Sequence, residues 1–577
     1  MVDQTKQNDH APELKNLRWI PALVLIAGIF LLPNLPYAFE APGIPIFMVA
    51  FFGPGVLGVL ALVWWIGLSR ATVREKFYGA IAVIVVSIVG ALLLHSSMQS
   101  ITWMTRVFPT SLACFALGTI ALSRSPVRLQ LGLLAMALCL AFWCSLQLKG
   151  TTGRFVSQYD WRWNATSEEK YLQSAARRSS SSYDVKSQPI HVADSPWPAF
   201  RGRDRSGVLA QISLPSDWKA KPPKLSWKRL IGPAWSSFTV ADKRLFSQEQ
   251  RGEKEAVICL NADTGEEIWN FDYPDRFWEA IAGAGPRATP TLAEEGLFAL
   301  GANGMLVCLD PVTGEQKWNA DLKKDGNRTP PQWGFSASPL VVAGLVIVHA
   351  GGANDKGLLA YDAKTGELRW SAASGDHSYS SAQLVTFFDV QGILMESNAG
   401  LSFHSIADGS VLWNHDAPVL NYRALQPLVD GNNVYLAATL GEGVDLLQVS
   451  KDQDKWKVDV LWHTRDLKPD FNDFVKQGDY LYGFDSNIFS CIDAKTGKRQ
   501  WKKGRYGNGQ VLSLPAAEQL LVISEAGELV LLHASPKGLE ELAKIPAIEG
   551  KTWNHPVVVG NRIYVRNGEE AACFSWE

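Results

Sequence analysis

The chain has 577 residues, a formal net charge of −2 and 19% charged residues. This length exceeds that of one compact domain, and hydropathy divides the chain at about residue 150. The balanced charge, the scattered basic residues and the lack of a nucleic-acid-binding motif argue against a nucleic acid as partner.

The first 150 residues contain five apolar segments, each near the length that crosses a bilayer. The segments lie at about 17–38, 44–69, 77–97, 107–123 and 128–148, and the fourth is short. The first is followed by four more without a cleavage site, so we do not expect a removable signal peptide. Ionisable residues are nearly missing from the segments, His95 being the main exception. This pattern favours a lipid-embedded anchor over a transporter.

Basic residues predict the orientation of this membrane domain. They gather before the first segment, between the second and third, and between the fourth and fifth, whereas the opposite loops carry almost none except Arg106. The positive ends are expected in the cytoplasm. Five crossings then place the remaining chain outside it. We therefore expect a multi-pass protein of the inner membrane with a cytoplasmic N-terminus and a periplasmic C-terminal domain.

The pattern divides the chain into four parts. Residues 1–16 are predicted as a cytoplasmic tail and 17–148 as the transmembrane domain. Residues 149–195, which include two arginines and a serine run at 177–182, are predicted as a linker. Residues 196–577 form the last part, and they contain a repeat.

The repeated phrase is a short apolar strand, a polar turn that ends in glycine, and a tryptophan four residues later, as in LAYDAKTGELRW ending at Trp370. The tryptophans recur every 39 to 52 residues in the well-aligned stretches, which is the period of a four-stranded propeller blade. Each one is expected to pack on the turn of the neighbouring blade. The expected docking residues are Trp227, Trp269, Trp318, Trp370, Trp413, Trp462 and Trp501.

Degenerate copies bring the predicted count to eight blades, with seven as the alternative. VDVLWHT supplies an outer strand around Trp462, and Leu542 replaces the tryptophan of a later blade. The chain ends with three strands, WNHPVVV, NRIYVRN and EAACFSW, and KLSWKRL at 224–230 is expected to add the fourth. Such closure removes exposed sheet edges. The predicted fold is an all-β eight-bladed propeller preceded by an α-helical membrane domain of about five spans.

Motifs for metal or nucleophile chemistry are missing. Cys259, Cys308 and Cys491 each lie six residues before a motif glycine, at a position that other repeats fill with alanine, phenylalanine or leucine. They are therefore expected to be core residues in separate blades rather than disulfide partners. No metal-binding spacing, phosphate-binding loop or nucleophile elbow occurs, so we assign no metal site.

The starts of the innermost strands define a candidate ligand or partner face, because in propellers they converge on the mouth of the central channel. The alignment gives one fixed cation, one carboxylate, two histidines and several aromatic residues, a usual composition for a ligand site. The alternative is a water-filled polar funnel. The set comprises Arg287, Trp333, Ser336, His377, Tyr379, Tyr422, Gln426, Asp473, Trp553 and His555.

The phrase A-x-D-x-x-T-G-x-x-x-W, seen from Ala360 to Trp370, resembles the tryptophan-docking motif of quinoprotein (PQQ-type) propellers. WPAFRGRDRSG, from Trp197 to Gly207, is similar to the opening segment of PQQ-like repeat proteins. The group includes PQQ-dependent dehydrogenases and non-enzymatic BamB-like assembly proteins. The resemblance spans most of residues 197–577 and is specific for fold rather than for activity.

Several departures from the dehydrogenases bear on catalysis. The chain lacks the adjacent cysteine pair of soluble PQQ alcohol dehydrogenases, the long insertions that build a cofactor chamber, and a recognisable Glu/Asn/Asp calcium trio. It also lacks the lipobox cysteine of BamB lipoproteins. In contrast, five spans before an exported propeller resemble membrane-bound quinoprotein glucose dehydrogenases, which also lack the cysteine pair.

The resemblance therefore implies a membrane-anchored, extracytoplasmic PQQ-like propeller that binds or scaffolds envelope proteins without a cofactor. The alternative is a membrane-bound PQQ-dependent dehydrogenase that uses PQQ with calcium, oxidises a sugar or alcohol and passes electrons to quinone. Asp473, Arg287 and His555 are then the catalytic candidates. A third possibility is an assembly factor that contacts a membrane complex through its spans.

Overall fold

The computed structural model describes residues 15–39, 44–99, 101–153, 156–176, 189–420, 422–439, 441–453 and 455–576. The tail before residue 15 and the arginine–serine run at 177–182 lie outside these residues. The chain divides into two compact units, one of Met1–Gly150 with Ser157–Asn164 and the other of Thr151–Val156 with Ala165–Glu577.

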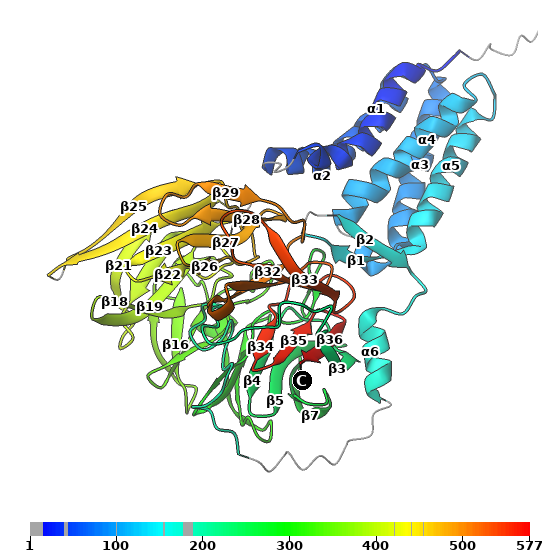
Figure 1. Cartoon of the computed structure of the whole chain (residues 1–577). Coiled ribbons are helices and arrows are strands. Elements are labelled where there is room, and N and C mark those ends of the chain that lie inside the picture. The colour runs from blue at the N-terminus through cyan, green and yellow to red at the C-terminus, as the bar shows by residue number, and fades with distance from the viewer. Residues whose placement is uncertain are drawn as a thin grey trace, which may run out of the picture. The chain divides into compact units, whose positions relative to one another are not determined.

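The first unit is a bundle of apolar helices (Figure 1). Its helices are α1 (Trp19–Leu31), α2 (Ile44–Val63), α3 (Val73–Leu93), α4 (Phe108–Ala121) and α5 (Arg128–Cys144). A seven-residue 3₁₀ helix extends α1 to Ala38, a π-helical turn extends α2 to Leu68, and another π-helical turn begins at Trp103 before α4. Among the described residues, four segments are long and apolar enough to cross a membrane, namely Trp19–Ala38, Pro45–Leu68, Val73–Leu93 and Trp103–Ala121.

The fifth predicted span is shorter than expected. The helix ends at Cys144, after 17 residues, because the chain turns at Ser145 and continues as strand β1 (Leu146–Thr151). β1 pairs with β2 (Ser157–Trp161) in a two-stranded sheet, and α6 (Ser167–Ala176) follows, so the predicted linker contains regular structure. The fourth span, short in the sequence, reaches 19 residues because helical structure already begins at Trp103.

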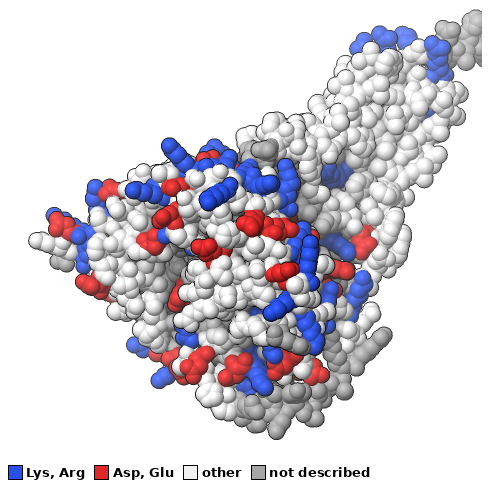
Figure 2. Space-filling model, in the orientation of Figure 1, with Lys and Arg blue, Asp and Glu red and all other residues white. Residues whose placement is uncertain are grey.

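Small residues and one buried ion pair hold the helices together. A Cβ on Gly118 of α4 would lie 2.9 Å from the Cα of Gly132 on α5, so these helices approach through paired glycines. Arg128 is fully buried and lies 2.7 Å from the Glu75 carboxylate at the start of α3. On the face seen in Figure 2, the helical unit carries charged side chains near its ends and almost none between them, as expected for a surface that meets lipid.

The second unit is a propeller of eight four-stranded sheets, which confirms the predicted count and excludes seven blades. Blades 1 and 2 comprise β4 (Thr239–Ala241), β5 (Arg244–Arg251), β6 (Lys254–Asn261), β7 (Glu267–Pro274), β10 (Thr291–Ala293), β11 (Gly296–Leu300), β12 (Met305–Leu309) and β13 (Gln316–Asp321). Blades 3 and 4 comprise β14 (Leu340–Val342), β15 (Leu345–His349), β16 (Leu358–Asp362), β17 (Leu368–Ala372), β18 (Gln383–Phe387), β19 (Val390–Ser397), β20 (Gly400–His404) and β21 (Val411–Asp416).

Blades 5 and 6 comprise β22 (Leu428–Asp430), β23 (Asn433–Ala438), β24 (Gly443–Asp452), β25 (Lys455–Thr464), β26 (Val475–Gln477), β27 (Tyr480–Asp485), β28 (Ile488–Asp493) and β29 (Arg499–Lys502). Blade 7 comprises β30 (Gln510–Leu514), β31 (Gln519–Ile523), β32 (Glu528–His533) and β33 (Glu540–Pro546). Blade 8 joins β34 (Val557–Val559), β35 (Arg562–Arg566) and β36 (Glu570–Ser575) to β3 (Lys224–Leu230). The ring is thus closed by strands from both ends of the propeller, as predicted. The short strands β8 (Trp278–Glu279) and β9 (Gly283–Ala284) and the one-turn helix α7 (Leu322–Asp325) lie between blades.

The repeated phrase joins neighbouring blades through one contact. The Asp362 carboxylate accepts hydrogen bonds from the backbone N–H groups of Lys364 and Thr365 and so fixes the turn. Gly366 follows with φ +74°, and a Cβ there would lie 2.6 Å from the ring of Trp318 in blade 2. Only glycine meets both demands. The Trp318 indole donates to the Ala363 carbonyl at 2.9 Å, which completes the joint.

The same indole-to-turn hydrogen bond recurs at four other blade junctions. Its donors are Trp227, Trp269, Trp370 and Trp501. Trp462 lies on Gly497, but its indole N–H is buried without an acceptor. Trp413 differs most, because blade 5 replaces the glycine turn with the long β24–β25 hairpin, and its indole N–H also has no acceptor among the described residues.

The cysteines behave as core residues. All seven are free, and Cys259, Cys308, Cys491 and Cys573 are buried in the blades. Cys259 and Cys308 pair across their ladders with Trp269 and Trp318. The packing position inferred from the repeat alignment is therefore confirmed.

Candidate functional site

The central channel contains a segment of the chain itself. Residues 197–208, called here the channel segment, precede the first propeller strand and run against the innermost strands. Trp197 forms an antiparallel bridge with Val240 of β4, and Val208 forms a parallel bridge with Ser513 of β30. The segment therefore pairs with innermost strands of the first and seventh blades, which flank the eighth.

Arg205 anchors the middle of the channel segment. Its buried guanidinium donates to the carbonyls of Ser338 and Ala382 at 3.2 and 3.0 Å, and to the Thr291 hydroxyl at 3.2 Å. Burial without a carboxylate partner lowers the pKa of Arg205 to about 9. The side chain thus binds backbone carbonyls at the strand starts of blades 3 and 4 and a hydroxyl of blade 2 at once.

Arg201 binds the carboxylate that the strand alignment placed at the channel. Its Nε lies 3.2 Å from Oδ2 of Asp473, and both side chains are only 3% exposed. Nε2 of His555 contacts the same carboxylate oxygen, and the Phe200 ring packs edge-to-face on the imidazole at 4.8 Å. The structure therefore brings Asp473 and His555 together, but with two residues of the channel segment on them.

The electrostatics of this cluster fix its protonation. Burial alone would raise the pKa of Asp473, but Arg201 and His555 outweigh it and the pKa lies below its ordinary value. Burial lowers the pKa of His555. At neutral pH the cluster is therefore an ionised carboxylate between a guanidinium and a neutral imidazole. A carboxylate stabilised in this way is a weak general base.

Gln426, Ser336 and other polar residues near the strand starts form hydrogen bonds with neighbouring blades or within their own segment. The Ser237 N–H donates to the Thr289 hydroxyl, and the Thr289 N–H donates to the Ser338 hydroxyl, both at 2.9 Å. Gln426 donates to the Ser381 carbonyl at 3.2 Å, and the Ser336 hydroxyl to the Gly334 carbonyl at 3.3 Å. These polar groups satisfy strand ends, which is what the funnel interpretation expects of them.

Four predicted aromatic residues form a second cluster. Trp333 lies perpendicular to Tyr422 at 4.4 Å and tilted against Tyr379 at 5.2 Å, and His377 is perpendicular to Tyr379 at 4.9 Å. The Tyr422 hydroxyl donates to Asp470 at 2.7 Å. The aromatic residues thus stack on one another and on a hydrogen-bonded carboxylate.

Trp553 belongs to a third cluster, centred on a lysine that the alignment did not select. The Lys551 ammonium lies 4.3 Å from the Trp553 ring and 5.1 Å from that of Trp235. It donates to the carbonyls of Thr151 and Ile281 at 3.0 and 3.1 Å. Burial lowers the pKa of Lys551 to about 8. Its position two residues before Trp553 was the available sequence signal.

Arg287 does not join the Asp473 cluster. It pairs with Glu279 at 3.1 Å and lies over the Phe277 ring at 4.4 Å. Burial lowers the pKa of Arg287 to about 10. The residues expected around one pit are therefore divided between the Asp473 cluster and a group in which Arg287 interacts with Glu279, Tyr379 and Lys551.

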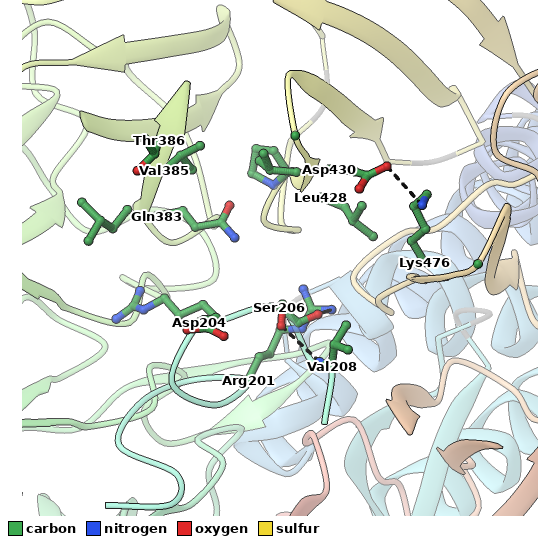
Figure 3. A pocket seen from close by; sticks show the side chains of 16 residues that line it. Arg201, Asp204, Ser206, Val208, Gln383, Val385, Thr386, Leu428, Asp430 and Lys476 are labelled. Carbon is green, nitrogen blue, oxygen red and sulfur yellow. Dashed lines mark hydrogen bonds and ion pairs between the residues drawn. The ribbon is translucent and has the colours of Figure 1, made fainter. Parts of the chain in front are cut away.

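A polar cavity of about 430 Å³ lies beside the channel segment (Figure 3). Its walls come from Arg201 to Val208, from β18 and from β22, and the Asp430–Lys476 ion pair at 3.1 Å lies at one side. Gln383 points into the space from β18, and its Oε1 is buried without a partner among the described residues. Sequence reasoning missed this cavity, because the channel segment that walls it is not part of the repeat.

A preformed calcium site is not seen among the described residues of the axis. In the described part of the chain, no group of three His, Cys, Asp or Glu side chains is placed to hold a metal ion. The Asp473 charge is already compensated by Arg201. The carboxylate on the axis thus binds a residue of the channel segment.

Comparisons with known proteins support this fold. Residues 253–503 match the family model described as outer membrane protein assembly factor BamB. The crystal structure of BamB from Moraxella catarrhalis is 13% identical with a TM-score of 0.45, covering 61% of this chain and 100% of that one. The quinohemoprotein alcohol dehydrogenase ADHIIG from Pseudomonas putida HK5 is 13% identical with a TM-score of 0.51, covering 67% and 81%. No curated protein sequence matches the chain.

The chain thus combines an eight-bladed propeller, which resembles the BamB family over residues 253–503, with N-terminal apolar helices that could span a membrane. The matching family model is that of an assembly factor, whereas the dehydrogenase structure shares the propeller fold. Function must therefore be argued from the residues of this chain.

Proposed function

We propose that this PQQ-like propeller is a membrane-anchored scaffold that lies outside the cytoplasm and binds other envelope proteins without catalysing a reaction. The observation that carries the proposal is the channel segment, which occupies the axis where a small ligand would bind. Arg201, Phe200 and Arg205 are all engaged there with channel residues.

A substrate on the axis would have to displace these contacts. Removing Arg201 would leave the buried Asp473 carboxylate without its guanidinium, which costs about 3–5 kcal/mol for a buried pair. An enzyme needs a base of suitable pKa within reach of substrate, and Asp473 offers neither the pKa nor the access. The blade edges and loops are thus left as binding surfaces.

The orientation rests on the basic residues. Arg18 and Arg70 lie at one end of the helical unit, where the Arg18 N–H donates to the Ser69 carbonyl. Arg124 lies at the same end, because its Nε donates to Asn16, which is two residues before Arg18. This end is assigned to the cytoplasm by the excess of positive charge. Counting the 17-residue helix α5 as a fifth crossing beside the four membrane-length segments, the proposal places the propeller in the periplasm and the protein in the inner membrane.

The outer edge of blade 5 is the strongest candidate surface for a protein partner. β25 is ten residues long and has no strand beyond it in its sheet. Val460 and Leu461 on this strand are 52% and 50% exposed. An unpaired edge with exposed apolar residues is a template for a partner strand.

Site-specific photo-cross-linking in native membranes tests the proposal. A photoreactive residue in place of Leu461 should give a discrete adduct with an envelope protein. The matched control replaces Leu368, which is 42% exposed on the five-residue outer strand β17. The adduct should disappear when the partner identified from Leu461 is deleted. Equal labelling from both positions would show that β25 is not a specific surface.

A second measurement addresses the dehydrogenase alternative. The full chain in detergent is titrated with PQQ and calcium while reduction of an artificial dye is followed with a panel of sugars and alcohols. We expect no saturable binding and no turnover. Binding at one site per chain with turnover would overturn the scaffold proposal and make Asp473, Arg287 and His555 the residues to mutate first.

A further inference from the structure

The hairpin formed by β1 and β2 covers the ends of two apolar helices (Figure 1). The Arg162 N–H, directly after β2, donates to the Ser145 carbonyl at 2.8 Å. Nη1 of Arg162 donates to the carbonyls of Leu93 and Cys144 at 2.9 and 3.4 Å. These carbonyls belong to the last residues of α3 and α5. Arg162 therefore marks the place where both helices end.

The length of α3 fixes the depth of this place in a bilayer. The helix has 21 residues, which at about 1.5 Å per residue gives about 31 Å, the thickness of a hydrocarbon core. At its other end Glu75 pairs with Arg128. Charged groups thus stand at both ends of a segment that is apolar between them. If α3 crosses the membrane, Arg162 lies at the level of the lipid headgroups.

Two tryptophans flank Arg162 at the same level. Trp161 is 44% exposed and Trp163 is 69% exposed. Their rings stack on each other at 5.1 Å with an angle of 8°. Such exposed indoles are unusual on a water-facing surface but are enriched at membrane interfaces, where the ring meets acyl chains and the N–H meets headgroups.

Arg162 keeps donors for a ligand. It is exposed and forms no ion pair among the described residues. Of its guanidinium nitrogens, Nη1 donates to the carbonyls of Leu93 and Cys144, and Nε and Nη2 have no acceptor among the described residues. Lys149 of β1 pairs with Asp160 at 3.3 Å, so a lysine already compensates that carboxylate, and the Arg162 charge has no carboxylate partner among the described residues. A guanidinium with free N–H groups is suited to a phosphate.

We propose that Trp161, Arg162 and Trp163 form a phospholipid-binding site at the membrane surface where α3 and α5 end. Arg162 binds the headgroup phosphate, and the stacked indoles lie at the level of the glycerol backbone and upper acyl chains. The inference rests on the apolar helices crossing a membrane and is independent of whether the propeller binds proteins or a cofactor.

Depth-dependent quenching tests the position of the indoles. The full chain is placed in nanodiscs of phosphatidylethanolamine and phosphatidylglycerol, with lipids brominated near the headgroup end of the acyl chain. The double variant W161F/W163F should lose the shallow quenched component that these two indoles contribute. The matched control is W278F, because Trp278 is 43% exposed on the propeller. An unchanged quenched component in W161F/W163F would overturn the proposal.

Retention of lipid tests Arg162 separately. Native mass spectrometry counts the phospholipids that remain on the chain after release from detergent. R162Q should retain at least one phospholipid fewer than the wild type. R369Q is the control, since Arg369 is an exposed arginine of the propeller. Equal counts for R162Q and R369Q would contradict the phosphate contact. If R162Q were less stable, the quenching of W161F/W163F would still test the site, because that measurement keeps Arg162.

Discussion

Replacing Arg201 by methionine should release the channel segment from the propeller. The substitution keeps an unbranched side chain in the channel but removes the guanidinium that lies 3.2 Å from Asp473. It also removes the hydrogen bond from Nη2 to the Ser206 carbonyl at 3.0 Å. Both charged groups are 3% exposed, so water does not replace the lost partner. The expected cost is about 3–5 kcal/mol, the range for a buried charge that loses its partner.

The assay is limited trypsin digestion of the full chain in detergent, read at the cleavage sites of the channel segment. A loss of about 3 kcal/mol in local opening raises the cleavage rate roughly 100-fold when opening is fast relative to cleavage. D473N should have a similar effect, because it strands the Arg201 guanidinium. The double variant R201M/D473N should recover much of the protection, since a neutral buried pair carries no unpaired charge.

Arg369 supplies the control for this experiment. It is 54% exposed and lies 4.0 Å from Asp362, so R369M should change stability by less than about 1 kcal/mol. Two results would refute the reasoning: R201M no more cleavable than R369M, or costs of R201M and D473N that simply add. Either would mean that the channel segment is held by something other than this pair.

Two further predictions concern the blades. W318F should lower the free energy of unfolding by about 1–2 kcal/mol more than W413F, because Trp318 donates to a turn carbonyl whereas the Trp413 N–H has no acceptor among the described residues. Pulse proteolysis in urea measures both losses, and equal losses would contradict the role of that hydrogen bond. Burial raises the pKa of Glu255 to about 7 from 4.5, so the protonated form stabilises the fold fully below about pH 4.5 and this contribution is lost as pH rises through about 7. E255Q should therefore gain stability relative to the wild type above pH 7, by up to about 3 kcal/mol, and a constant difference from pH 5 to 9 would rule this out.

The blades could be predicted from the sequence because each one repeats the same local solution. A turn carboxylate, a glycine at positive φ and a tryptophan recur at fixed spacing, and any one copy predicts the others. Gly366 shows why the pattern is strict: a side chain there would collide with Trp318. Closure by β3 was predictable for the same reason, since Trp227 carries the phrase into the last sheet.

Blade 5 shows the limit of this reasoning. Its tryptophan, Trp462, is in the expected outer strand, but the turn on which Trp413 would dock is absent. The β24–β25 ladder instead runs on to Asp452 and Lys455, where a hairpin replaces the turn. Strand alternation continues through both arrangements, so the sequence pattern does not distinguish them.

The sequence could select residues of the candidate site, but it could not predict which groups they contact. Alignment of the strand starts selected Asp473 and His555, and the structure places them in contact. It could not reveal Arg201 between them and the channel, because the channel segment occurs once and has no repeat to align with. Arg287 was placed in the same set by register alone, and its partner is Glu279 from the β8–β9 hairpin.

This contrast bears on function. The repeated residues build a ring that many proteins share, so they carry no information on activity. Three basic residues lie outside the repeated phrase, namely Arg201 and Arg205 in the channel segment and Lys551 beside Trp553. Each forms its ion pair or hydrogen bonds with groups of the chain itself. Because these charges bind groups within the chain, the space left beside the channel segment is the polar cavity in which Gln383 Oε1 has no partner among the described residues. On the scaffold proposal, partner specificity comes from surfaces that the ring presents outward, such as the edge of β25.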